Sequence, residues 1–270
     1  MIRKCRYFSN LIDLEVDDMK ILEWNVNCAV GSGNGRKELS SLFPDKPDYD
    51  ILVLTEFYRL DDYGEFEEII KNWGYEVFIT DEQKNRNDIF IAVSKEYEPK
   101  LEKNQVAREG MPDFLAIPLK SGHKDFVIVG VRFFGDYEDK YSQFIKFLHH
   151  INCYENIIIA GDFNNAKIRG DENTIYTERQ IDRLYSYHEE GIMKKYQQFE
   201  YNYHRIKLWF AQNEISLVTP IEGVSFPYKS SYPTGSKIDH FATKSILISN
   251  VEYLPTELSD HYQLVGEITV

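Results

Sequence analysis

Ile157–Asn165 reads Ile-Ile-Ile-Ala-Gly-Asp-Phe-Asn-Asn, an apolar run that ends in polar side chains. Short apolar runs of this kind are typical of strands buried on both faces. Polar groups at the tips of buried strands are where α/β enzymes assemble their sites. The stretch therefore predicts a buried strand that presents Asp162 and Asn164 at its end. Taken alone, Gly-Asp and Asn-Asn are also typical of a turn.

Four further signatures end in polar side chains in the same way. They are Trp24-Asn25-Val26-Asn27, Leu54-Thr55-Glu56-Phe57, Lys237-Ile238-Asp239-His240 and Ser259-Asp260-His261. Asn25 and Asn27 are two positions apart, which on a strand places both side chains on one face. Together the signatures supply carboxylates, carboxamides and an imidazole without a thiol, a mixture that suits Mg²⁺ and a phosphate ester.

Each signature is weak when taken separately. A lone acid at a strand end, such as Glu56, usually meets solvent, and an Asn-x-Asn pair is also typical of a turn. A buried Asp beside a His fixes the tautomer of the imidazole and raises its basicity. Asp239 and His261 suit that pairing, although the sequence does not show whether they touch.

The bulk composition describes a globular chain of 270 residues, 43% hydrophobic, with a formal net charge of −13. This acidity argues against a nucleic-acid coat protein, which needs many phosphate contacts from Lys and Arg. The three cysteines form no CxxC pair, so neither a zinc site nor a disulfide framework is indicated. The sequence shows no membrane span or signal peptide, and we expect a cytoplasmic protein without a membrane partner.

Strand and helix patterns alternate in the first half, and strands surround a helical stretch in the second. Helical spacing predicts helices over Tyr63–Trp73 and Asp136–Asn152, with a shorter helical segment over Arg36–Phe43. Thr177–Asn213 predicts one long helix, or two helices broken near Gly191. Strands are expected over 19–27, 50–57, 75–80, 88–94, 113–119, 125–134, 156–163, 216–218, 224–227, 237–243, 246–254 and 262–269.

Two mixed sheets packed face to face, with helices outside, would use all of these elements. No composition shift marks a boundary, so we expect an N-terminal extension over residues 1–18 and one domain over 19–270.

The joint pattern from Lys20 to the C-terminus resembles the endonuclease/exonuclease/phosphatase superfamily of phosphoesterases. Gly161-Asp162-Phe163-Asn164 and Ser259-Asp260-His261 are its most specific pieces. The resemblance implies a four-layer α/β sandwich with the site at one edge of the two facing sheets. It also implies a Mg²⁺ or Mn²⁺ cofactor and in-line attack of an activated water on phosphorus.

On the metal side, the resemblance implies that Glu56 is the principal metal ligand. Asn27 and Asp260 complete the metal side, and Asn25 binds the substrate phosphate. On the catalytic side, it implies that Asp162 activates the attacking water and that Asn164 positions this water.

The imidazole of His261 is expected to contact the phosphate, oriented by Asp239. The strand 126–134 usually ends, in this superfamily, with a His or Tyr that faces the phosphate. Here Arg132 stands in that place, and a guanidinium can neutralise phosphoryl charge but cannot act as a general acid. The alternative is a surface arginine at a strand edge.

We therefore expect a divalent-metal-dependent phosphoesterase, with nucleic acid as the first choice of substrate. The alternatives are a small-molecule or lipid phosphodiesterase or phosphatase, and a catalytically silent binding module on the same fold. The oligomeric state is not predicted.

Two further features bear on the substrate. Basic residues near the signatures either focus phosphates at the site or are scattered solvated side chains: Lys167, Arg169, Lys229 and Lys237. Tyrosines of the helical stretch either stack on bases or, as their spacing favours, pack in the core: Tyr185, Tyr187, Tyr196, Tyr201 and Tyr203.

Overall fold

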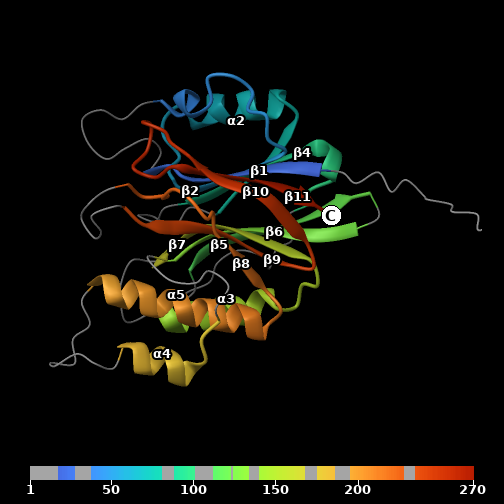
Figure 1. Ribbon diagram of the computed structural model, residues 1–270. Helices are drawn as coiled ribbons and strands as arrows, with labels where there is room; N and C mark the ends of the chain where they lie inside the picture. The colour runs from blue at the N-terminus through green and yellow to red at the C-terminus, as the bar shows by residue number, and fades with distance from the viewer. Residues whose placement is uncertain are drawn as a thin grey trace, which may run out of the picture.

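Two mixed β-sheets face each other through an apolar interior, and helices cover the outer face of each sheet (Figure 1). The structure is a computed structural model. It describes residues 18–27, 38–80, 88–100, 112–122, 124–133, 140–167, 175–185, 195–227 and 235–270.

The first sheet has six strands in the order β10-β11-β1-β2-β4-β3. Their bounds are β1 Asp18–Asn25, β2 Ile51–Phe57, β3 Tyr75–Ile79, β4 Asp88–Ser94, β10 Leu247–Leu254 and β11 Gln263–Thr269. β1 and β2 are parallel, and the other pairings in this sheet are antiparallel. The carboxyl ends of β1 and β2 therefore lie at the same edge as the start of β11.

The second sheet has five strands in the order β5-β6-β7-β9-β8. Their bounds are β5 Asp113–Ser121, β6 Lys124–Arg132, β7 Ile157–Lys167, β8 Ser216–Val218 and β9 Lys237–Lys244. β6 and β7 are parallel, and the other pairings in this sheet are antiparallel. Gly161 allows the close approach of β6 and β7, since a Cβ at this position would lie 1.8 Å from the carbonyl oxygen of Val131.

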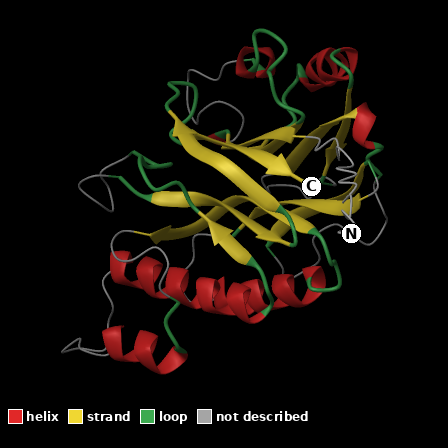
Figure 2. Ribbon diagram, turned by 45° about the vertical axis from the view of Figure 1, so that its right-hand side comes forward, coloured by secondary structure: helices red, strands yellow, loops and turns green. Residues whose placement is uncertain are grey.

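Helix α2 (Tyr63–Asn72) covers the first sheet, and α3 (Lys140–Ile151) and α5 (Lys195–Gln212) cover the second (Figure 2). Helix α4 (Glu178–Tyr185) packs outside α5. Two short 3₁₀ turns, Leu39–Leu42 and Lys95–Tyr97, complete the elements of the described residues. No helix in this part of the chain is both long enough and apolar enough to cross a membrane.

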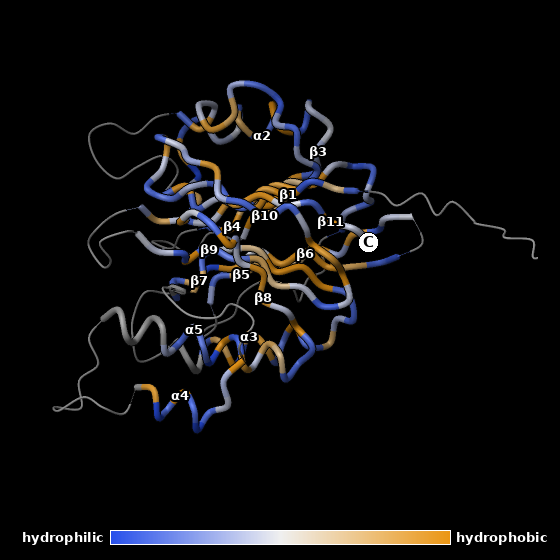
Figure 3. The backbone as a smooth tube through the Cα atoms, viewed as in Figure 1, coloured by the Kyte–Doolittle hydropathy of each residue, from blue (hydrophilic) through white to orange (hydrophobic). Residues whose placement is uncertain are grey.

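Alternation along the strands directs apolar side chains to both faces of each sheet, which gives one layer between the sheets and one layer under the helices on each outer side. Figure 3 shows that hydrophobic residues are concentrated on the strands. On β6, Ile128 faces the other sheet, whereas Val129 faces the helices. On β1, Ile21 faces the other sheet, whereas Leu22 faces the layer of α2. These periods confirm the predicted four-layer sandwich.

Most predicted elements are confirmed within a few residues. The long helical stretch is two helices, with residues 186–194 outside the described residues. The predicted strand at 224–227 is wrong, because only an isolated bridge joins Phe226 to Ser236. The predicted extension lies outside the described residues except for Asp18, which begins β1.

Candidate functional site

The predicted site residues meet at one edge of the two sheets. In the second sheet Arg132, Asp162 and Asp239 lie in one row across neighbouring strands, because Arg132 pairs with Asp162 and Asp162 pairs with Asp239. Their apolar neighbours on the same faces, such as Ile128 and Ile158, form the layer between the sheets. Alternation therefore directs this charged row toward the first sheet, where Asn25 ends β1.

Glu56 reaches the site through an irregularity in β2. The pairing of β2 with β4 shifts by one residue between Leu54 and Phe57, and Glu56 has a φ of 51°. A left-handed bulge inserts an extra residue and re-aims its side chain. Glu is not a residue that adopts this conformation readily, so the surrounding ladder imposes it.

Asn27 and Asn164 also have left-handed backbones, with φ values of 47° and 48°. Asn tolerates this region better than most residues, because its short polar side chain bonds to the local backbone. In both places the side chain two positions earlier also accepts the backbone N–H: the amide N–H of Asn27 donates to Asn25 Oδ1, and that of Asn164 donates to Asp162 Oδ1. Asn164 nevertheless belongs to β7, whose pairing with β9 shifts between Asp162 and Lys167, so the strand continues here with an irregularity instead of ending in a turn. These hydrogen bonds also hold the site side chains.

Asp162 is buried and accepts hydrogen bonds from two carboxamides. Asn25 Nδ2 donates to its Oδ2 at 3.1 Å, and Asn164 Nδ2 donates to the same oxygen at 2.7 Å. Burial and the nearby charge of Asp239 raise the pKa of Asp162 to about 7, against the opposing effects of His261 and Arg132. A carboxylate with this pKa is a stronger base than an exposed aspartate.

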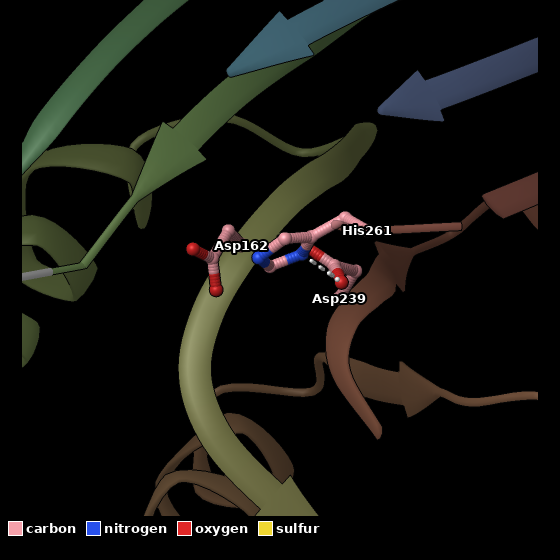
Figure 4. Close-up of side chains that lie close together, drawn as sticks. All are labelled: Asp162, Asp239 and His261. Carbon is pink, nitrogen blue, oxygen red and sulfur yellow. Dashed lines mark hydrogen bonds and ion pairs between the residues drawn. The ribbon is translucent and has the colours of Figure 1, made fainter. Parts of the chain in front are cut away.

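His261 and Asp239 form a buried dyad. Nδ1 of His261 lies 2.8 Å from Oδ2 of Asp239, and Figure 4 shows the imidazole between Asp239 and Asp162. Burial opposes protonation, but the charge and hydrogen bond of Asp239 outweigh it and raise the pKa of His261 to about 9. The imidazole is therefore positively charged at neutral pH.

The surroundings of the dyad fix both partners. Ser225 Oγ accepts the backbone N–H of Asp239 at 3.1 Å, and the indole of Trp24 donates to the carbonyl of His261 at 3.1 Å. The ring of Phe226 lies 5.0 Å from that of His261. The contacts of Ser225 and Phe226 come from the segment 224–227, so this segment supports the site although it is not the predicted strand.

A hydrogen bond from Ser259 joins the last signature to β1, and Asp260 follows it in the chain. Ser259 Oγ donates to the carbonyl of Asn25 at 2.7 Å. Burial raises the pKa of the half-buried Asp260, and the charge of Glu56 contributes to this rise. The structure thus brings Asp260 into the electrostatic range of Glu56.

Arg132 contacts Glu56 directly. Its Nε donates to Oε1 of Glu56 at 2.8 Å, and its Nη2 lies 2.7 Å from the same oxygen. Both side chains are mostly buried. Arg132 is therefore not an exposed strand-edge cation, and the contact that the structure shows is to the carboxylate of Glu56.

Glu23 is a buried acid that the sequence reasoning missed. It is fully buried on β1, two positions before Asn25, and Thr55 donates a long hydrogen bond to its Oε1 at 3.4 Å. Burial, followed by the charges of Asp239 and Asp162, raises the pKa of Glu23 well above its usual value. The shared alternation of Glu23 and Asn25 along β1 was the signal that could have found it.

The donor set fits a divalent cation of the Mg²⁺ type. The carboxylates of Glu56 and Asp260 and the carboxamide of Asn27 are hard oxygen donors. A second group, Asp162, Asp239 and His261, has ligand atoms that all lie within 4.8 Å of one another. There a cation would have to displace a proton from the imidazole, which the raised pKa of His261 opposes.

The sequence clues to the substrate have mixed outcomes. Lys237 Nζ donates to the backbone carbonyls of Pro220 and Ile221, so these contacts hold the loop after β8. Tyr203 is buried, as core packing predicts. Tyr201 is half-buried and packs against the apolar layer outside the second sheet, which also fits core packing. The remaining clues concern residues or side chains outside the described part: Lys167, Arg169, Lys229, Tyr185, Tyr187 and Tyr196.

Comparisons with known proteins give matches in structure alone. No protein-family model matches the chain, and no curated protein matches its sequence. The chain is similar to the endonuclease domain of TRAS1, a telomere-specific non-LTR retrotransposon, with 13% identity and a TM-score of 0.57 over 93% of this chain and 99% of that chain.

Two further solved structures are similar at comparable levels. ANGEL2, described as a 2′,3′-cyclic phosphatase, gives 15% identity and a TM-score of 0.57 over 94% of this chain and 96% of that chain. An endonuclease/exonuclease/phosphatase protein from Beutenbergia cavernae gives 15% identity and a TM-score of 0.59 over 94% of this chain and 72% of that chain. The chain has the fold of the endonuclease/exonuclease/phosphatase superfamily.

Proposed function

We propose that this protein is a divalent-metal-dependent phosphoesterase that hydrolyses phosphodiester bonds in nucleic acid. The observation that carries the proposal is that ligand atoms of Asp162, Asp239 and His261 all lie within 4.8 Å of one another, at the edge where β1 ends in Asn25 and Glu56 lies next to the end of β2. A buried base beside a buried imidazolium fits the activation of water next to a phosphate anion.

In the proposed reaction, Asp162 takes a proton from the attacking water. Asn25 and Asn164 hold its carboxylate through their Nδ2 groups, so the base has a fixed direction. The water oxygen bonds to phosphorus as the ester P–O bond breaks. The water proton goes to Asp162, and the leaving oxygen is protonated from solvent.

His261 stabilises the charge that develops on the phosphoryl oxygens. Asp239 holds Nδ1, which leaves Nε2 to donate to a phosphate oxygen. A cation held by Glu56, Asn27 and Asp260 would supply Lewis-acid neutralisation of the phosphoryl group. Arg132 is the further cation of the site, and Mg²⁺ or Mn²⁺ is the proposed metal.

Nucleic acid is the proposed substrate class because several similar structures are described with nucleic-acid chemistry. They include the TRAS1 endonuclease domain and D. rerio TDP2 complexed with a single-strand DNA product. ANGEL2 was solved with adenosine-2′,3′-vanadate, and another neighbour is an inositol polyphosphate 5-phosphatase domain. A small-molecule phosphatase is therefore the second candidate. We also propose that the protein acts in the cytoplasm.

A substrate panel tests the proposal. Plasmid DNA, an abasic duplex, RNA, sphingomyelin and inositol phosphates are each incubated with Mg²⁺ or Mn²⁺ and with EDTA. We expect cation-dependent cleavage of a nucleic acid. Cleavage of inositol phosphates alone would select the second candidate, and no turnover of any ester would favour a binding module on this fold.

A further inference from the structure

The ion pair of Arg132 and Glu56 joins the two sheets at the site. Glu56 lies on β2 of the first sheet, and Arg132 ends β6 of the second. Two nitrogens of the guanidinium converge on a single carboxylate oxygen, Oε1, at 2.7 and 2.8 Å. The side chains are only 16% and 17% exposed, so solvent screens the pair weakly.

A pair of this kind is costly to separate unless each partner acquires a new counter-charge. A divalent cation on Glu56 competes with the guanidinium for the same carboxylate. The arginine stays charged at every accessible pH, and the nearby carboxylates of Asp113 and Asp162 also attract it. Of the groups that enter the site, a phosphate anion matches the guanidinium best, because it accepts the planar fork in a bidentate manner.

We propose that Arg132 couples metal binding to phosphate binding: it neutralises Glu56 in the metal-free protein and turns to the substrate phosphate when a divalent cation takes Glu56. The inference rests on the proposed function, since it assigns Glu56 to the metal. Without metal, Arg132 holds the carboxylate of Glu56 in place. With metal on Glu56, Arg132 binds the substrate phosphate. By linkage, phosphate must tighten metal binding by the same factor as metal tightens phosphate binding.

Binding of Mn²⁺, measured by the electron paramagnetic resonance signal of the free ion, tests this coupling without turnover. Each protein is titrated with and without inorganic phosphate, against protein-free blanks. In the wild type we expect phosphate to lower the Kd of Mn²⁺ by a factor of about 5 to 150. In Arg132→Met we expect Mn²⁺ to bind more tightly than in wild type without phosphate, and the phosphate effect to shrink.

Arg205→Met is the matched control. Arg205 is 17% exposed and pairs with Glu178, but it lies in the outer helical layer. We expect it to leave both Mn²⁺ titrations unchanged. If Arg132→Met does not fold, Arg132→Lys replaces it: its single ammonium should compete less well for Glu56, so Mn²⁺ affinity rises and coupling falls, both to a smaller extent.

The alternative is that Arg132 acts only as a long-range positive charge and never exchanges Glu56 for phosphate. This alternative predicts a different effect of Arg132→Met on the coupling. Such a charge would attract phosphate with or without metal, so its removal would leave the phosphate effect unchanged or larger. That outcome, or an unchanged Mn²⁺ affinity in Arg132→Met, would overturn the inference. Coupling without hydrolysis of any phosphoester would reject the proposed function but support the role of Arg132 inferred here. Hydrolysis without coupling would support the proposed function and reject this role of Arg132.

Discussion

Replacement of Asp239 by Asn should lower the pKa of His261 by more than about two units. In the wild type the pKa of His261 is about 9, against an ordinary value of 6.5. This difference corresponds to roughly 3.5 kcal/mol in favour of the imidazolium, at ~1.4 kcal/mol per unit. Asp239→Asn removes the largest cause that raises the pKa and leaves burial, which lowers it, against the smaller raising effects of Asp162 and Asp260. The pKa should therefore fall to about 6.5 or below.

The same shift sets a pH dependence of stability. Because the folded state holds the His261 proton more tightly than the unfolded chain, the pair stabilises the fold fully below about pH 6.5. This contribution is lost as the pH rises from 6.5 through about 9. Between these values the free energy of unfolding should fall in the wild type and change less in Asp239→Asn.

Proton NMR of the imidazole Hε1 signals, in EDTA from pH 5.5 to 10, measures the titration directly. The His261→Gln spectrum identifies the signal, and Asp125→Asn is the control, since Asp125 is exposed at the opposite end of β6 from Arg132. A wild-type pKa near 6.5, or one that Asp239→Asn does not move, would refute the dyad.

Three shorter predictions follow from the same geometry. Asp162→Asn and His261→Ala should each lower kcat on the order of 10² to 10⁴-fold, and the double variant should be little worse than the poorer single one; multiplicative losses in steady-state assays would count against a shared site. Glu23→Gln should raise the Tm in EDTA by an amount that grows from pH 5 to pH 8, because ionisation of the buried Glu23 costs stability as the pH rises; parallel Tm curves would contradict this. Gly161→Ala should abolish soluble expression or lower the free energy of unfolding in urea by several kcal/mol. Gly64→Ala is the control: a Cβ at Gly64 meets no atom within 4 Å, so this variant should be neutral or stabilising by up to about 1 kcal/mol. Equal effects would refute the tight approach of β6 and β7.

The sequence alone predicted the two-sheet fold because apolar runs and helical spacing are local signals. Ile157–Ile159 forms a buried strand because its three apolar side chains fill the apolar layers on both faces of the sheet, and the same apolar run predicts a buried strand from the sequence. The site residues converge because strand ends that run in the same direction share an edge. Alternation then settles which of them face inward, as it does for Asp162.

Long-range geometry could not be predicted in the same way. The contact of Arg132 with Glu56 depends on a left-handed bulge at a glutamate, a residue type that gives no local signal for it. The strand predicted at 224–227 does not form, because the backbone N–H groups of Ser225 and Phe226 both donate to the carbonyl of Ser236, so the pairing stops at a single bridge. Tertiary hydrogen bonds outweighed the local pattern there.

Hydrolysis of bis-p-nitrophenyl phosphate tests the central claim most directly. The wild type, Asp162→Asn and the exposed control Asp125→Asn are assayed with Mg²⁺, with Mn²⁺ and with EDTA. We predict cation-dependent release of p-nitrophenol by the wild type and by the control, and a loss on the order of 10² to 10⁴-fold in Asp162→Asn. Equal rates in all three proteins, or a wild-type rate that EDTA does not change, would contradict a metal-dependent phosphoesterase site at this edge of the sheets.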